Sequence, residues 1–149
     1  METIEWATVA DVLAKIAIAY VLALPVAWDR ERQGRSAGLR TFPLVATAAT
    51  AFVLLARVEY SESAEAQARV VEGLITGIGF IGGGAILRER GSVHGTSTAA
   101  SIWATAAIGA ATAYGRYEIA LVLSAIIFTT LRLLARFKTE GDVRDGGTI

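Results

Sequence analysis

The chain has 149 residues, enough for one domain, and 54% of them are hydrophobic, with a mean hydropathy of +0.50. Its formal net charge is zero, so no bulk positive field indicates a nucleic-acid partner. The absence of cysteine excludes disulfides and thiolate metal sites. The apolar residues cluster in runs, which is typical of a membrane protein rather than of a soluble core.

Five apolar runs predict an all-α, polytopic membrane bundle of about five transmembrane helices. A hydrocarbon core of roughly 30 Å needs about 20 helical residues. The first, third and fifth runs fit this length, whereas the second and fourth are short, rich in Ala and Thr, and expected to rely on neighbouring helices. Pro43 lies in the first turn of the second run, where its missing N–H costs little. The runs are 7–28, 41–56, 70–87, 97–113 and 117–135.

Charge predicts the orientation. Ten basic residues lie at or after the C-terminal ends of the first, third and fifth runs. The opposite ends of the runs carry only Arg57, Arg69 and Arg116, and Lys15 lies within the first run. By the positive-inside rule the N-terminus faces outward and the C-terminus faces the cytoplasm. Residues 1–138 then form the transmembrane domain, and the polar, Gly-rich segment 139–149 forms a disordered cytoplasmic tail. The basic residues predicted to lie inside are Arg30, Arg32, Arg35, Arg40, Arg88, Arg90, Arg132, Arg136, Lys138 and Arg144.

A repeat of two helical hairpins is suggested by the triplet Arg-Glu-Arg, which occurs at 30–32 and again at 88–90. Both hairpins would run inward, turn in the cytoplasm and return, as parallel repeats do. Chance similarity between two Ala-rich segments remains an equal alternative. With gaps allowed, the alignment pairs Gly34 with Gly91, Gly38 with Gly95, and Thr41 with Thr98.

The third run carries a glycine pattern, Gly77-Ile78-Gly79-Phe80-Ile81-Gly82, that matches the dinucleotide-binding fingerprint. No strand precedes it and it lies inside an apolar run, so nucleotide binding is not favoured. Small residues four apart let helices approach closely in lipid. This spacing predicts packing against the small residues of the fourth run, which are Ala99, Ala100, Ala106, Ala107 and Gly109. Unwinding of the run at mid-membrane is the alternative. The predicted helix-packing positions are Gly73, Gly77, Gly79, Gly82, Gly83 and Gly84.

Acids mixed with the arginines at the predicted cytoplasmic mouth indicate a functional polar cluster. Lipid anchoring by arginines does not need Asp29, Glu31 or Glu89, although interfacial anchoring is the common alternative. Magnesium binding at these acids is a hypothesis only. The cluster is predicted to contain Asp29, Arg30, Glu31, Arg32, Arg40, Thr41, Arg88, Glu89 and Thr98.

No catalytic group, cofactor or metal site is predicted. His94 is the single histidine, and a lone histidine cannot make a His-rich metal site. No nucleophile and base are arranged recognisably. We therefore do not expect an enzyme.

Three segments in order resemble the signature motifs of the MgtC/SapB membrane proteins: residues 29–41, 77–87 and 95–109. The resemblance extends over about residues 20–115. Two departures are mild: Asp29 stands where the family mostly has Glu, and Gly83 stands where it often has Ala.

The resemblance implies a multi-pass protein of the bacterial inner membrane. Well-known members act in survival at low magnesium and inside macrophages and are linked to regulation of the ATP synthase and membrane potential. Those members also carry a C-terminal soluble domain, for which this sequence has no counterpart.

Three functions follow as hypotheses. The first is a regulator of another membrane complex or of ion homeostasis under stress such as low magnesium, acting through helix faces or cytoplasmic loops. The second is a small-ion transporter or channel component with a polar site at the cytoplasmic mouth. The third, an intramembrane enzyme, is the least favoured because no paired catalytic groups lie at mid-depth. Expected partners are the lipid bilayer, another membrane complex and a second copy of the chain through the glycine faces.

Overall fold

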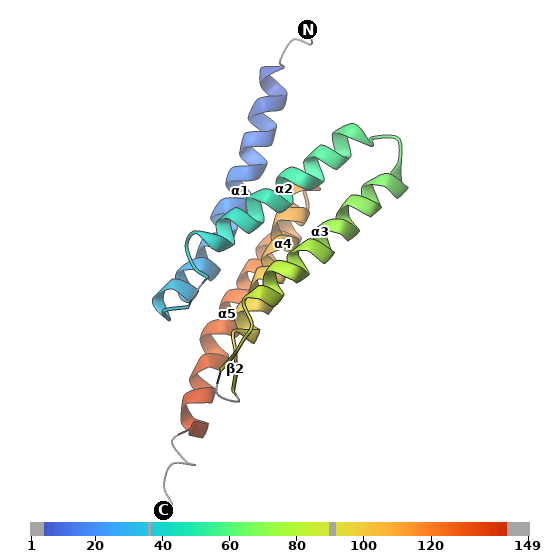
Figure 1. Ribbon diagram of the computed structural model, residues 1–149. Helices are drawn as coiled ribbons and strands as arrows, with labels where there is room; N and C mark the ends of the chain where they lie inside the picture. Colours follow the sequence, from blue (N-terminus) through green and yellow to red (C-terminus); the bar gives the residue numbers. More distant parts are fainter. Residues whose placement is uncertain (1–4, 36, 90–91, 143–149) are drawn as a thin grey trace, which may run out of the picture.

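The computed structural model describes residues 5–35, 37–89 and 92–142. They form a bundle of five helices with one short β-hairpin (Figure 1), which confirms the all-α prediction. Helix α4 is central, because it packs against each of the other four helices. The elements are α1 (Trp6–Arg32), α2 (Thr41–Glu59), α3 (Ala64–Gly84), β1 (Leu87–Glu89), β2 (Ser92–His94), α4 (Thr96–Ala113) and α5 (Tyr117–Asp142).

Short connections reverse the chain after each of the helices α1 to α4 (Figure 1), so the C-terminal ends of α1 and α3 lie near the N-terminal ends of α2 and α4. This end of the bundle, which also contains the C-terminal part of α5, is called the arginine end. Its basic residues with described side chains are Arg30, Arg32, Arg35, Arg40, Arg88 and Arg132. The fold therefore gathers the residues that were predicted to lie inside, while their side of the membrane stays a prediction.

Local sequence explains the helix boundaries. Helix α2 begins at Thr41 as predicted, with Pro43 in its first turn. Helix α3 begins at Ala64, six residues before the apolar run, because Ser63 caps it: the Ser63 Oγ accepts from the Ala66 N–H at 3.2 Å. Glu65 in the first turn complements the positive end of the helix dipole.

Three helices are long and apolar enough to cross a membrane: α1, α2, and residues 117–134 of α5. The prediction that the third run is better suited to spanning than the second is wrong. The first turns of helix α3 contain the charged residues Glu65, Arg69 and Glu72, which lower its mean hydropathy. Helix α2 instead extends beyond the run drawn for it, through Arg57 to Glu59, and qualifies by length and composition.

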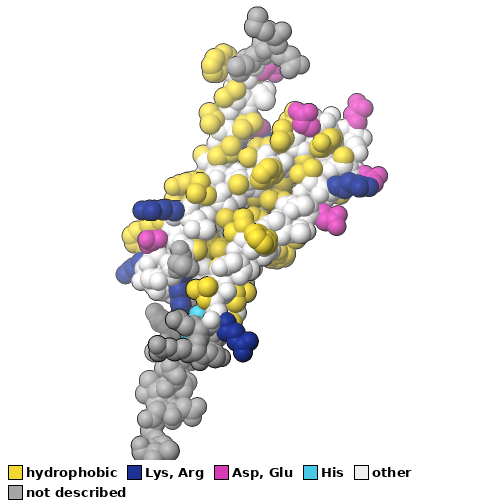
Figure 2. Space-filling model, in the orientation of Figure 1, with side chains coloured by type: hydrophobic (Ala, Val, Ile, Leu, Met, Phe, Trp, Pro, Cys, Tyr) yellow, Lys and Arg dark blue, Asp and Glu magenta, His cyan; other side chains and the backbone are white. Residues whose placement is uncertain are grey.

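The bundle interior is built from small side chains. Ala19, Ala23, Ala46, Ala49 and Ile108 are fully buried. Many large apolar side chains face outward (Figure 2), as expected of a protein whose surroundings are lipid. They include Leu44, Phe52, Leu55, Phe80, Trp103, Leu121 and Val122.

Hydrogen bonds from hydroxyl groups join helices across this interior. The Thr50 Oγ1 on α2 donates to the Gly109 carbonyl on α4 at 3.0 Å. The Ser124 Oγ on α5 donates to the Leu22 carbonyl on α1 at 2.6 Å. Leu22 lies three residues before Pro25, which lacks the N–H that would continue the helix ladder. Helix α5 is thereby joined to α1 beside a proline.

Two predictions fall partly outside the described residues. The backbone of α5 stays helical to Asp142, so 139–142, assigned from the sequence to the tail, belong to that helix, and 143–149 lie outside the description. Arg90 and Gly91 of the second triplet also lie outside it.

The two proposed repeats are locally equivalent where their second helices begin. The Gly38 carbonyl accepts from the Phe42 N–H at 3.2 Å, and the Gly95 carbonyl accepts from the Ala99 N–H at 2.8 Å. The connecting segments differ, because a β-hairpin precedes α4 and none precedes α2 in the described residues. The repeat as a whole stays a prediction.

Candidate functional site

A buried ion pair lies at the arginine end of α1. Asp29 and Arg30 are 6% and 2% exposed. The Arg30 Nη2 donates to the Asp29 Oδ2 at 2.7 Å, and the Gln33 Nε2 donates to the same oxygen at 2.8 Å. A buried charge is tolerated only when it is paired and hydrogen-bonded, so each member depends on the other. Gln33 was missed from the sequence, although its place one helical turn after Asp29 could have indicated it.

The Glu31 side chain does not join the ion pair; it bonds to the backbone of the loop that follows α1. Its Oε2 accepts from the Leu39 N–H at 3.0 Å. A Cβ on Gly38 would overlap this carboxylate oxygen. Glu31 and Gly38 are therefore matched: the missing side chain of one leaves room for the carboxylate of the other.

Replacing Gly38 with alanine should destabilise the protein by about 1–2 kcal/mol, because the new methyl group displaces Glu31 and leaves the Leu39 N–H without this acceptor. The midpoint of thermal unfolding in detergent would measure the loss. In a Glu31→Ala background, the same Gly38 substitution should lower the free energy of unfolding much less. An equal cost in both backgrounds would contradict the proposed match.

The remaining members of the predicted polar cluster do not join the ion pair. Arg32 is exposed and lies over the Trp28 ring, 5.9 Å from its centroid. Arg40 and Arg88 are exposed, Thr41 is half-buried and Thr98 is buried. The side chain of Glu89 lies outside the description. Because α1 stays helical through Arg32, successive residues point in different directions, and the nine residues do not form one buried cluster within the described part.

The predicted glycine packing is largely wrong for contacts within this chain. A Cβ on Gly82 would lie 3.1 Å from the Ala99 carbonyl oxygen, so this glycine does allow α3 to approach α4. The other five have no described atom that a Cβ would meet within 4 Å: Gly73, Gly77, Gly79, Gly83 and Gly84. Helix α3 is continuous to Gly84, so the alternative of an unwound mid-membrane segment is also wrong.

Among the described helical glycines, Gly109 makes the closest approach to another helix. A Cβ there would overlap the Ala46 carbonyl oxygen and lie 2.9 Å from the Ala49 Cβ. The sequence had placed Gly109 opposite α3, whereas it packs on α2. Helix order in the bundle, which a sequence pattern does not supply, decides this partner.

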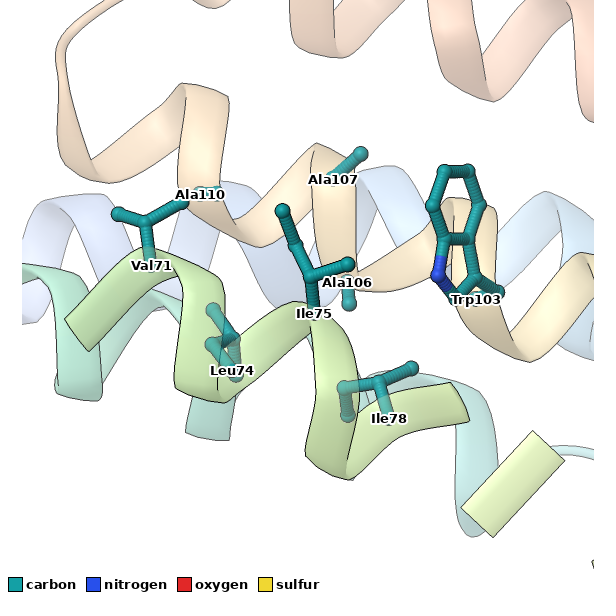
Figure 3. Close-up of a pocket in the computed structure, with 8 residues that line it drawn as sticks. All are labelled: Val71, Leu74, Ile75, Ile78, Trp103, Ala106, Ala107 and Ala110. Atoms are coloured by element: carbon teal, nitrogen blue, oxygen red, sulfur yellow. The ribbon is translucent and has the colours of Figure 1, made fainter. Parts of the chain in front are cut away.

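The middle of the bundle offers apolar cavities. One, of about 160 Å³, lies between α3 and α4 (Figure 3), where Leu74, Ile75 and Ile78 face Trp103 and Ala106. A second, of about 490 Å³, lies along the outer face of α3 beside Phe52 of α2. The buried hydroxyls of Thr50, Thr105 and Thr112 donate to backbone carbonyls of their own helices. The described middle thus offers packing surfaces rather than titratable groups.

Metal binding finds no support in the arrangement of side chains. Within 5–35, 37–89 and 92–142, no three His, Cys, Asp or Glu side chains are grouped so that they could hold an ion. Asp29 is occupied by Arg30 and Gln33, and Glu31 by Leu39.

Residues 16–140 match the sequence model of the MgtC family. The chain belongs to the MgtC family. Protein SrpB of Synechococcus elongatus is 35% identical over 136 residues, covering 83% of this chain and 73% of SrpB. Protein MgtC of Salmonella typhimurium is 37% identical over 116 residues, covering 78% of this chain and 49% of that protein.

Protein MgtC of Brucella abortus is 35% identical over 129 residues, covering 87% of this chain and 53% of that protein. The chain thus spans about half the length of these two MgtC proteins. No solved structure matches. The resemblance read from the three motifs is confirmed, and the family together with the apolar helices makes this a bacterial membrane protein.

Proposed function

We propose that this MgtC-family chain is a multi-pass, non-catalytic protein of the inner membrane that regulates another membrane complex, and through it ion homeostasis under stress such as low magnesium. The observation that carries the proposal is the uncovered glycine face of α3. Gly73 and Gly77 lie one helical turn apart with no described atom near their Cβ positions. Such spacing suits close approach of another transmembrane helix.

The surroundings of these glycines fit a helix rather than a small molecule. Gly73 and Gly77 line the cavity of about 490 Å³, whose walls include Phe52 and Phe80. Phe80 is 85% exposed. A partner helix lying on the glycines would cover these aromatic rings, and buried aromatic residues commonly dominate the affinity of an interface.

Transport is the weaker alternative. A small ion needs polar groups along its path, and the cavities at mid-bundle are lined by apolar side chains. The buried ion pair lies at one end of the bundle. We therefore expect no ion flux through proteoliposomes containing the chain, and flux that vanishes with Asp29→Asn would favour transport instead.

The test of regulation substitutes Gly77→Leu, which places a large side chain on the face proposed to receive the partner. Recovery of the co-purifying membrane complex should fall about tenfold, as for loss of an interface hot spot. Gly79→Leu is the matched control. Gly79 also has nothing near its Cβ position, but it does not line the cavity of about 490 Å³.

Both variants should accumulate in membranes like the unmodified chain. Equal recovery of the complex with both would overturn the docking face. Crosslinks from this face to a second copy of the chain alone would replace the partner complex by a homo-oligomer.

A further inference from the structure

A polar cavity of about 280 Å³ lies at the arginine end, between the end of α1, the start of α4 and the C-terminal half of α5. It differs from the apolar cavities at mid-bundle, because charged, amide and hydroxyl side chains form much of its wall. These are Arg30, Gln33, Arg35, Thr96, Ser97 and Thr130.

Arg30 is the anchor of this wall. It is 2% exposed, and the Asp29 carboxylate is the one described acceptor for its guanidinium, at Nη2. Its buried Nε–H has no hydrogen-bond partner among the residues described. A guanidinium carries five N–H donors, and buried donors in native proteins almost always find an acceptor. The unfilled donor capacity indicates that an acceptor belongs at this place.

The start of α4 adds a second source of donors. Its N-cap is Gly95, at φ +87°, and no side chain within the described residues caps the helix. The Ala99 N–H is the first to bond back, to the Gly95 carbonyl. The N–H groups that precede it, at the positive end of an 18-residue helix dipole, are typical donors to phosphate groups.

The balance of charge in the cavity favours an anion. Arg30 and Arg35 contribute two positive charges, and Asp29 contributes one negative charge that already accepts from Arg30 and Gln33. The carboxylate of Glu31 is bonded to the Leu39 N–H. Arginine is well suited to phosphate, since its planar fork can bind two oxygens at once.

An apolar groove continues from this cavity along α4 and α5. It has a volume of about 280 Å³ and shares Ser97, Thr130 and Leu131 with the polar cavity. Its other walls are Ala100, Ala104, Ile126 and Ile127, with Ser101. A polar mouth that leads into an apolar groove has the form of a phospholipid: a phosphate group followed by an acyl chain.

We propose that this cavity binds the phosphate group of an anionic phospholipid, with one acyl chain lying in the α4–α5 groove. Basic pockets between transmembrane helices recognise lipid headgroups in this way. The lipid would satisfy the donors of Arg30 and of the α4 N-terminus and cover the groove. The site is separate from the α3 face and does not depend on the proposed partner complex.

Native mass spectrometry of the full chain in detergent, titrated with dioleoylphosphatidylglycerol, tests the proposal. Arg35→Gln should weaken binding about tenfold, as expected for a hydrogen bond to a charged group. Arg32→Gln is the matched control: it removes the same charge from the same end, but Arg32 does not line the cavity. Its binding should stay within about twofold of that of the unmodified chain. Equal binding to both variants would overturn the site.

Two further arms identify the source of the phosphate. Ala100→Trp fills the groove from an exposed position, so it should weaken binding of the lipid without disturbing the buried pair. Millimolar inorganic phosphate should not displace the lipid, and dioleoylphosphatidylcholine should bind more weakly. If inorganic phosphate displaces the lipid and Ala100→Trp binds the lipid as the unmodified chain does, the lipid proposal is overturned. The cavity would then be a site for soluble phosphate.

Discussion

Replacing Gly109 with leucine should prevent stable assembly of the bundle. The new side chain would enter the contact between α4 and α2, where even a Cβ overlaps the Ala46 carbonyl oxygen and crowds the Ala49 Cβ. A backbone carbonyl cannot turn aside as a flexible side chain can, so the helices must separate. Overpacking of a buried contact costs about 1–3 kcal/mol for extra methylenes, and we expect a loss of about 3 kcal/mol or more here.

Separation of the helices would also break the hydrogen bond from Thr50 to the Gly109 carbonyl. The measurement is the fraction of monodisperse protein recovered in detergent and its unfolding midpoint. Gly83→Leu serves as the control, since a Cβ on Gly83 meets nothing within 4 Å. Similar losses for both substitutions would show that Gly109 has no special place in the packing.

Asp29→Ala should destabilise the protein by about 3–5 kcal/mol, because it leaves the Arg30 guanidinium buried without its acceptor. Unfolding followed by circular dichroism in detergent would report the loss. Glu65→Ala is the matched control: Glu65 also pairs with a cation, Arg69, but both side chains are exposed, by 78% and 75%. An exposed pair of this spacing contributes about 0.3–0.5 kcal/mol.

The double variant Asp29→Leu with Arg30→Met separates the two sources of this cost. Replacing both charges with apolar groups removes the unpaired charge, so stability should recover by a large part of the loss seen with Asp29→Ala. Binding of dioleoylphosphatidylglycerol should be weaker in the double variant than in the unmodified chain, because the Arg30 guanidinium is gone. A double variant as unstable as Asp29→Ala would contradict the explanation that the unpaired charge of Arg30 causes the loss.

Hydropathy and charge predicted the helices because those properties are local. Helix α2 begins at the predicted residue and α4 begins one residue before the predicted one. The start of α3 was missed because its capped first turns are polar, and hydropathy records only the apolar part. The β-hairpin from Leu87 to His94 was missed because its strands have only three residues each, too few for a period to be visible.

Tertiary partners were harder to predict than helices. Gly109 was paired with α3 on spacing alone, although the fold places it on α2. Adjacent residues in a charged segment point in different directions on a helix, so Arg30 is buried while its neighbour Glu31 is exposed. Arg35 and Ser97 became candidates only once the fold had brought three separate segments around one cavity.

The hydrogen bond from Ser124 to the Leu22 carbonyl has a consequence for biosynthesis, because 102 residues separate its two partners. At a translation rate of about 5–20 residues per second, α1 must wait roughly 5–20 seconds before α5 exists. During that interval α1 lacks its neighbour α5 along part of its length. Helix α5 therefore completes the wall around α1, and a chain stalled before Ser124 would leave this face of α1 uncovered and open to membrane proteases.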